Sequence, residues 1–133
     1  MVQKYFNMGG IIMIKVFVYG TLMRGHINHS SYLSKSKFLG EADLAGYAMY
    51  SVSSFPGIVT DPSEKVKGEV YSVDTETLRR LDSLEGEGSL YIRKMVDIQL
   101  NNETIQGFVY IWNSNTNGVQ KISYASQPWK GGL

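Results

Sequence analysis

The side chains best suited to acid–base chemistry in this sequence are two carboxylates in the segment DTETLRRLDSLEG, residues 74–86. Helix-forming residues fill this segment and a glycine ends it, which predicts a short helix. At about 100° per residue, Glu85 falls between Leu78 and Leu81 on the apolar face, in the last turn. Apolar surroundings and the negative end of the helix dipole both raise a carboxyl pKa, towards the range of a general base near neutral pH.

Two other interpretations of these carboxylates stay open. The helix end can fray at Leu84, so that Glu85 simply points to water beside Gly86. Asp82 borders the same apolar face and is the rival candidate, although an acid at that position is also typical of a solvent-exposed helix surface. The pattern on the helix alone does not decide between them.

A second candidate site lies where an apolar run stops abruptly. In VFVYGTLMRG, residues 16–25, four apolar or aromatic strand formers are followed by Gly20 and Thr21. A strand that ends in this way leaves backbone N–H groups without partners, and such groups bind a carboxylate or an oxyanion. A tight turn without a ligand has the same sequence pattern.

Other site chemistries have less support. His26 and His29 are three residues apart and could bind a metal on a helix, but their Gly and Asn neighbours favour a loop with solvated side chains. A metal-dependent hydrolase using both histidines is the remaining alternative of that kind. The sequence contains no serine nucleophile elbow, no phosphate-binding loop ending in Lys-Ser or Lys-Thr, and no dinucleotide fingerprint. Covalent serine chemistry and nucleotide binding are therefore not expected.

The elements that must position these residues are mostly strands. The helix over 74–86 is expected to start at Asp74 or Thr75 and to end with Gly86 in the left-handed conformation. One helical turn is expected near 30–33, and the tail segment SYASQPW is expected to dock on the body of the protein. The predicted strands are 14–19, bent segments over 37–52 with bulges at Gly40 and Gly46, a short edge strand at 57–60 between two turns, 66–73, and a hairpin of 91–100 and 104–112.

This order of elements predicts an α+β fold with one or two short helices. Its five to seven strands are expected to be mostly antiparallel and to form a small mixed β-barrel, because closing the sheet disposes of exposed strand edges. The length of 133 residues suits one domain. We expect that domain at 13–133, after a flexible N-terminal extension at 1–12.

Composition excludes several classes of partner. The formal net charge is +1, and the 13 Lys and Arg residues are scattered, so neither nucleic acid nor a membrane surface is an expected partner. The chain has no cysteine, which removes thiolate nucleophiles and cysteine metal sites and fits a reducing compartment. No apolar run approaches the ~20 residues of a membrane-spanning helix. We expect a cytoplasmic protein, a monomer or weak dimer, that binds a small molecule.

Four blocks taken together resemble the γ-glutamylcyclotransferase-like family, in particular its short γ-glutamylamine cyclotransferase branch. They are VYGTLMRG, FPGIV, VKGEVYSV and LDSLEGEGSLYIRKMV. The resemblance runs from about residue 15 to residue 112, and its specificity rests on the order and spacing of the Tyr-Gly-Thr-Leu and Leu-Glu-Gly blocks. It implies a compact mixed barrel with a cavity at one end, and neither a cofactor nor a metal.

The resemblance also implies roles for particular residues. It places a binding loop at Tyr19, Gly20, Thr21 and Leu22, where backbone amides hold the glutamyl part of the substrate. It makes Glu85 the acid/base.

Three further residues follow less firmly from the resemblance. Tyr91 and Arg93 match a Y-x-R pattern that shapes or supports the pocket in the family, although strand packing explains them equally well. Tyr124 is a candidate for an aromatic side chain that closes over the site. Beyond residue 112 the match is loose, so the substrate cannot be chosen from it.

The activity implied is release of 5-oxoproline and a free amine from a γ-glutamyl amine. The substrate's own α-amine attacks its γ-carbonyl carbon, with one Glu as acid/base. The alternative is a non-catalytic module on the same barrel that binds γ-glutamyl or other small acidic ligands. The cost of burying Glu85 argues against that alternative.

Overall fold

The computed structural model describes residues 5–6 and 12–131 of the chain. Within these residues the predicted α+β class, with mostly antiparallel strands and short helices, is confirmed. The elements in chain order are β1 (Tyr5–Phe6), β2 (Ile12–Val18), α1 (His29–Tyr32), β3 (Lys37–Ser51), β4 (Pro56–Asp74), α2 (Thr75–Glu85), β5 (Tyr91–Leu100), β6 (Glu103–Trp112), β7 (Gln120–Ile122) and the short 3₁₀ helix η1 (Tyr124–Ser126).

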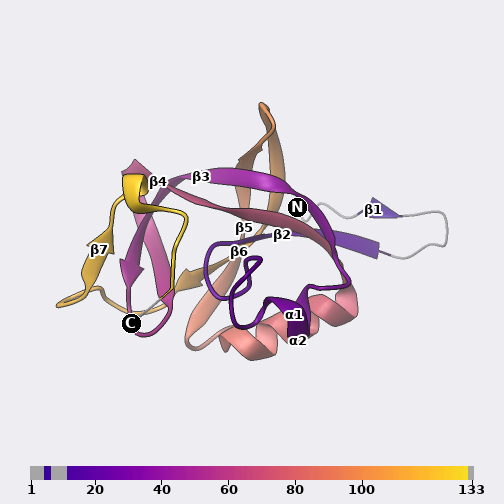
Figure 1. Ribbon diagram of the computed structural model, residues 1–133, viewed down its shortest axis with the longest axis horizontal. Helices are drawn as coiled ribbons and strands as arrows, with labels where there is room; N and C mark the ends of the chain where they lie inside the picture. The colour runs from indigo at the N-terminus through magenta and orange to yellow at the C-terminus, as the bar shows by residue number, and fades with distance from the viewer. Residues whose placement is uncertain (1–4, 7–11, 132–133) are drawn as a thin grey trace.

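The strands form one sheet that closes into a ring. Its order is β1-β2-β4-β3-β5-β6, with β7 paired to β3. The neighbours along this path are antiparallel, and β2 also pairs in parallel with β6, at Val16 and Phe108, which closes the ring. Figure 1 shows α1 and α2 together below the sheet, where Arg80 of α2 donates to the Ser31 carbonyl of α1 at 2.9 Å.

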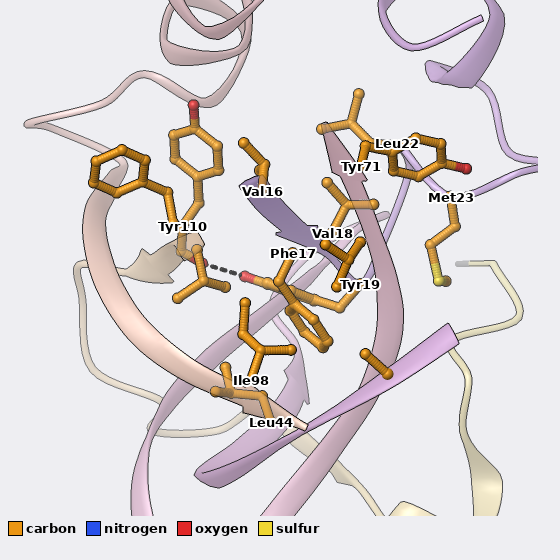
Figure 2. Close-up of a cluster of buried hydrophobic side chains, with 14 of the residues drawn as sticks. Val16, Phe17, Val18, Tyr19, Leu22, Met23, Leu44, Tyr71, Ile98 and Tyr110 are labelled. Carbon is orange, nitrogen blue, oxygen red and sulfur yellow. Dashed lines mark hydrogen bonds between the residues drawn. The ribbon is translucent and has the colours of Figure 1, made fainter. Parts of the chain in front are cut away.

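The core is built around β2, as its continuous apolar sequence predicts. Val16 and Phe17 are fully buried, because the ring surrounds this strand with β4 on one side and β6 on the other. Figure 2 shows both side chains in the buried cluster that also contains Ile98 and Leu44, and it draws the bond from the Tyr19 hydroxyl to the Tyr110 carbonyl as a dashed line. Pairing with β4 and this hydrogen bond to β6 together hold the end of β2 in place.

The strand β4 is longer than the sequence predicts. The turn expected between strands at 57–60 and 66–73 is wrong, because β4 continues through it. The register with β3 passes from Ala45↔Lys65 to Tyr47↔Thr60, so residues 61–64 lie opposite Gly46 alone. The proline of this stretch, Pro62, has no N–H to donate and falls outside the paired register. Gly40 and Gly46 have φ of 151° and 89° and mark the two register shifts, as predicted.

The helix α2 begins and ends as predicted. The Asp74 side chain accepts a hydrogen bond from the Thr77 amide at 2.7 Å, and Gly86 ends the helix with φ of 64°. The predicted hairpin is also confirmed, with Asn101 and Asn102 at φ of 52° and 66° in its two-residue turn. The helix α1 begins one residue before the predicted helical turn.

The tail docks on the sheet, as expected. The Gln127 side chain is buried, accepts from the Lys67 amide at 2.8 Å and donates to the Ile122 carbonyl at 3.1 Å. Of the extension predicted at 1–12, residues 1–4 and 7–11 lie outside the described part, and β1 pairs with the start of β2. Across the described ranges, 5–6 and 12–131, no helix has the length and apolar character needed to cross a membrane.

Candidate active site

A cavity of about 220 Å³ opens where β2 ends. Segments far apart in the chain line it: residues 17–22 with Asn28, residues 55–56, residues 84–85, residues 90–91, and Tyr110. Most of these side chains are apolar or aromatic. A small cavity with few polar groups and one ionisable acid is a typical binding site for a small molecule.

Glu85 is the single charged side chain among the described residues that line this cavity. It is the last residue of α2 and lies beside the apolar face of the helix, as the spacing of about 100° per residue predicts. Its side chain is half-buried, and in the described part of the chain it makes neither a hydrogen bond nor an ion pair. Burial raises its pKa from 4.5 to about 7. This carboxyl group can therefore both take and release a proton near neutral pH.

Asp82 has the opposite environment. One carboxylate oxygen accepts from the Tyr110 hydroxyl at 2.7 Å, and the other accepts from Arg93 Nη1 at 2.6 Å. It is not part of the cavity lining. Both Asp82 oxygens accept hydrogen bonds that connect α2 to β5 and β6. The Glu85 carboxyl group has no such partner among the described residues.

The loop that follows β2 lines the cavity and contains backbone amides without hydrogen-bond partners in the described residues. The Met23 amide donates to the Gly20 carbonyl at 3.1 Å, and the Asn28 amide and side chain donate to the Thr21 carbonyl and Oγ1, each at 2.9 Å. These bonds fix the loop. The Thr21 and Leu22 amides have no hydrogen-bond partner within the described residues. Leu22 is a buried residue, and a buried N–H group is stabilised by a hydrogen-bond acceptor.

Gly20 has a packing reason to lack a side chain. A Cβ atom there would lie 2.8 Å from Cγ of Pro56, far inside normal contact distance. The Pro56 carbonyl in turn accepts from the Tyr91 hydroxyl at 2.6 Å. The loop, the start of β4 and the start of β5 therefore meet as one wall of the cavity.

Six of the eight predicted site residues come together in this cavity, and two do not. Arg93 lies outside it, paired with Asp82 and with its guanidinium 4.5 Å from the Phe108 ring centroid. Tyr124 also lies elsewhere: its hydroxyl donates to Asp43 at 3.0 Å. The six that line the cavity are Tyr19, Gly20, Thr21, Leu22, Glu85 and Tyr91.

Sequence reasoning missed several lining residues. Phe55 and Pro56 belong to the FPGIV block that carries the family resemblance, so that block was an available signal. No pattern in the sequence around Asn28 or Tyr110 marks either of them as a site residue. The Tyr110 carbonyl accepts from Tyr19, which lies 91 residues earlier, and only the closure of the sheet reveals that contact.

The two histidines are engaged in other contacts. The His26 ring lies 5.0 Å from the Trp129 ring, centroid to centroid, and His29 Nδ1 lies 3.0 Å from the Leu22 carbonyl oxygen. In the part of the chain that the structure describes, no three His, Cys, Asp or Glu side chains gather to hold a metal ion.

The fold and cavity define a class of protein: a small α+β protein in which a closed sheet holds a small, mostly apolar cavity with one carboxyl group. Residues 16–131 match the family model described as gamma-glutamyl cyclotransferase, AIG2-like. The chain belongs to this family, and the resemblance recognised in the sequence is confirmed.

Relatives and solved structures agree with this assignment. A Methanocaldococcus jannaschii protein, provisionally named a gamma-glutamylcyclotransferase, is 43% identical over 100 residues, which are 73% of this chain and 82% of that protein. The gamma-L-glutamyl-butirosin B gamma-glutamyl cyclotransferase of Niallia circulans is 35% identical over 79% of this chain and 70% of its own length. The crystal structure of an AIG2-like protein from Mus musculus superposes with a TM-score of 0.71 at 30% identity, covering 79% of this chain and 80% of that one.

Proposed function

We propose that the protein is a γ-glutamylamine cyclotransferase that converts a γ-glutamyl amine into 5-oxoproline and a free amine. Membership of the family supports gamma-glutamylcyclotransferase activity in general. One observation carries the finer proposal: a desolvated carboxyl group without a partner, Glu85, shares a small cavity with the free amides of Thr21 and Leu22.

The two amides supply the recognition of the glutamyl group. Backbone N–H groups held rigidly in a loop bind a carboxylate without losing conformational freedom on binding. The cavity is smaller than the roughly 300 to 1,000 Å³ of pockets for drug-sized ligands. It therefore suits the glutamyl head group alone, with the amine substituent directed towards the opening.

The reaction forms one bond and breaks one. The α-nitrogen of the substrate forms a C–N bond to its own γ-carbonyl carbon, and the bond from that carbon to the amine nitrogen breaks. The α-ammonium nitrogen loses two protons as it becomes the ring N–H group. Glu85 takes one of them and gives it to the departing nitrogen, so the carboxylate is regenerated, and the second passes through water to the released amine, which leaves as an ammonium ion. Holding the amine and the carbonyl in attack geometry supplies a large part of the rate.

Tyr19 and Tyr91 form walls of the cavity and have no proton to transfer in this scheme. Their hydroxyls donate to the Tyr110 and Pro56 carbonyls, and burial raises the pKa of both hydroxyls above the usual value of 10.0. Arg93 acts through Asp82, at a distance from the substrate. Tyr124 is outside the cavity lining and is given no role in this scheme.

The test is a panel of γ-glutamyl amines and γ-glutamyl dipeptides, with 5-oxoproline measured by mass spectrometry. At least one compound should yield 5-oxoproline, and the same compound acetylated on its α-amine should not, because that nitrogen is the nucleophile. Equal cleavage of the acetylated compound would show hydrolysis instead of cyclisation. Binding of the panel without turnover would identify a non-catalytic binding module.

A further inference from the structure

The residues that line the cavity differ in exposure, which separates its floor from its mouth. Tyr19, Gly20 and Tyr91 are buried and form part of the floor. We define the mouth as the five lining residues, other than Glu85, that are half-buried or exposed: Thr21, Asn28, Phe55, Leu84 and Leu90. With the glutamyl group held by the backbone amides of Thr21 and Leu22 beside Glu85, the departing amine is directed towards the side chains of the mouth.

The mouth has apolar side chains and no charge. The amide of the Asn28 side chain donates to Thr21 Oγ1 at 2.9 Å, so these two polar groups already satisfy each other. Glu87, on the loop after α2, is not part of the lining, and its carboxylate accepts from the Arg93 amide at 3.3 Å. A cationic amine substituent would therefore find no lining counter-charge except Glu85, which the reaction itself uses.

Leu90 is unusual because it is both exposed and part of the cavity. It is 43% exposed, and among the described residues the other exposed large apolar side chain is Ile27, at 82%. The Phe55 ring lies 6.4 Å from the ring of Tyr91, centroid to centroid, which extends the aromatic floor towards the surface. An apolar group bound at the mouth would remove the surface of Leu90 from water, and that burial is favourable.

We infer that the amine released from this cavity carries an uncharged, apolar substituent, which packs against Phe55, Leu84 and Leu90. The inference rests on the proposed cyclotransferase function and names its substrate class. A charged substituent would either lose hydration against these side chains without a partner or remain in water and gain nothing.

Two substrates of equal size test the inference directly. The γ-glutamyl amide of n-hexylamine ends in a methyl group, and the γ-glutamyl amide of 1,5-diaminopentane ends in an ammonium group at the same position. We expect kcat/KM for 5-oxoproline release to be about tenfold or more higher for the hexylamide, the range that a hydrophobic pocket gives for small apolar differences.

Two matched variants test whether the side chains of the mouth cause the preference for the hexylamide. Leu90→Ala should lower kcat/KM for the hexylamide about fivefold and lower it less for the aminopentylamide, because only the hexylamide can bury a terminal methyl group against this side chain. Ile27→Ala, which removes an exposed apolar side chain outside the cavity lining, should leave both within about twofold. A general disturbance of the loop would lower both substrates together.

The outcomes separate this inference from the proposed function. Equal kcat/KM for the two amides, or a preference for the aminopentylamide, overturns the inference while the release of 5-oxoproline upholds the cyclotransferase. A preference for the hexylamide that Leu90→Ala does not reduce also overturns it. If neither these amides nor any compound of the panel yields 5-oxoproline, the proposed function fails and the inference falls with it.

Discussion

At the scale of single residues, the proposed function of Glu85 has a cost to stability. Its pKa is raised by burial from 4.5 to about 7, so folding favours the protonated form. The contribution of that form to stability is complete below the unfolded value and is lost as pH rises through the folded value. Above pH 7 the buried charge is therefore unfavourable, by about 3 kcal/mol or less. Its helix position was predictable from sequence, but its lack of a partner was not, because that depends on strands distant in the chain.

The variant Glu85→Gln should separate these two effects. The amide keeps the shape of the side chain and cannot exchange the proton, so we expect turnover to be lost. Removal of the charge should raise the melting temperature at pH 8 by several degrees and change it little at pH 5. Thermal unfolding at both pH values and the 5-oxoproline assay measure the two effects.

Asp82→Asn is the control for that experiment, since Asp82 is the other carboxylate of the same helix. It should lower stability by weakening the pair with Arg93, which is 2.6 Å long, and reduce the rate only moderately. Near-normal turnover by Glu85→Gln, or a loss of turnover in Asp82→Asn alone, would show that Glu85 is not the acid/base.

The pH dependence of the reaction should report the same group. As a base in the free enzyme, Glu85 must be ionised, and its ionised fraction falls as pH drops below about 7. We expect kcat/KM to decline about tenfold per unit below that pH. The measurement is a kcat/KM profile for one substrate, taken from pH 5 to 8. A profile that is flat over this range would contradict a raised pKa at the catalytic group.

At the scale of elements, the loop between β2 and α1 links packing to the proposed substrate binding. Gly20, near the start of this loop, has no room for a methyl group beside Pro56, where the distance would be 2.8 Å. In Gly20→Ala the loop must shift and carry the Thr21 and Leu22 amides with it. We expect a folded protein with KM raised about tenfold and kcat changed less, measured by steady-state kinetics together with a thermal melt.

Gly25→Ala provides a comparison within the same loop. Gly25 has φ of 85°, and no atom lies within 4 Å of the place that a methyl group would take, so alanine there strains the backbone without a clash. It should lower stability by about 1 kcal/mol and leave KM unchanged. A similar rise of KM in both variants would mean that loop strain in general, and not the contact with Pro56, controls binding.

The elements also show what local sequence can and cannot predict. The helix α2 and the β5–β6 hairpin follow from short-range signals, namely the Asp74 cap, Gly86 and the two Asn residues of the turn. The continuity of β4 does not, because Asp61 and Pro62 favour a turn locally and pairing with β3 on both sides of them prevails. Long-range pairing overrides local preference wherever the neighbouring strand is long enough to supply it.

At the scale of the whole molecule, closure of the sheet brings the two halves of the site together. The parallel contact of β2 with β6 sets Tyr110 beside the end of β2, where its carbonyl accepts from Tyr19 at 2.7 Å. The hydroxyl of the same residue donates to Asp82 on α2, also at 2.7 Å. Tyr110 therefore connects the strand that leads into the proposed binding loop with the helix that carries Glu85. The sequence contains no local pattern for such a connection, which is why this residue was not predicted.

The role of Tyr110 as a connection can be tested by removing its hydroxyl. Tyr110→Phe keeps the carbonyl that accepts from Tyr19 and deletes the bond to Asp82, so α2 keeps its tie to Arg93 alone at this point. We expect a loss of about 1 to 2 kcal/mol in stability. We also expect kcat to fall a few-fold with KM little changed, because the end of α2 positions Glu85 while the loop amides are held elsewhere. Tyr124→Phe, which deletes the bond to Asp43 outside the cavity, is the matched control and should leave kcat and KM within about twofold. Equal losses of kcat in the two variants would show that the link through Tyr110 does not position the site.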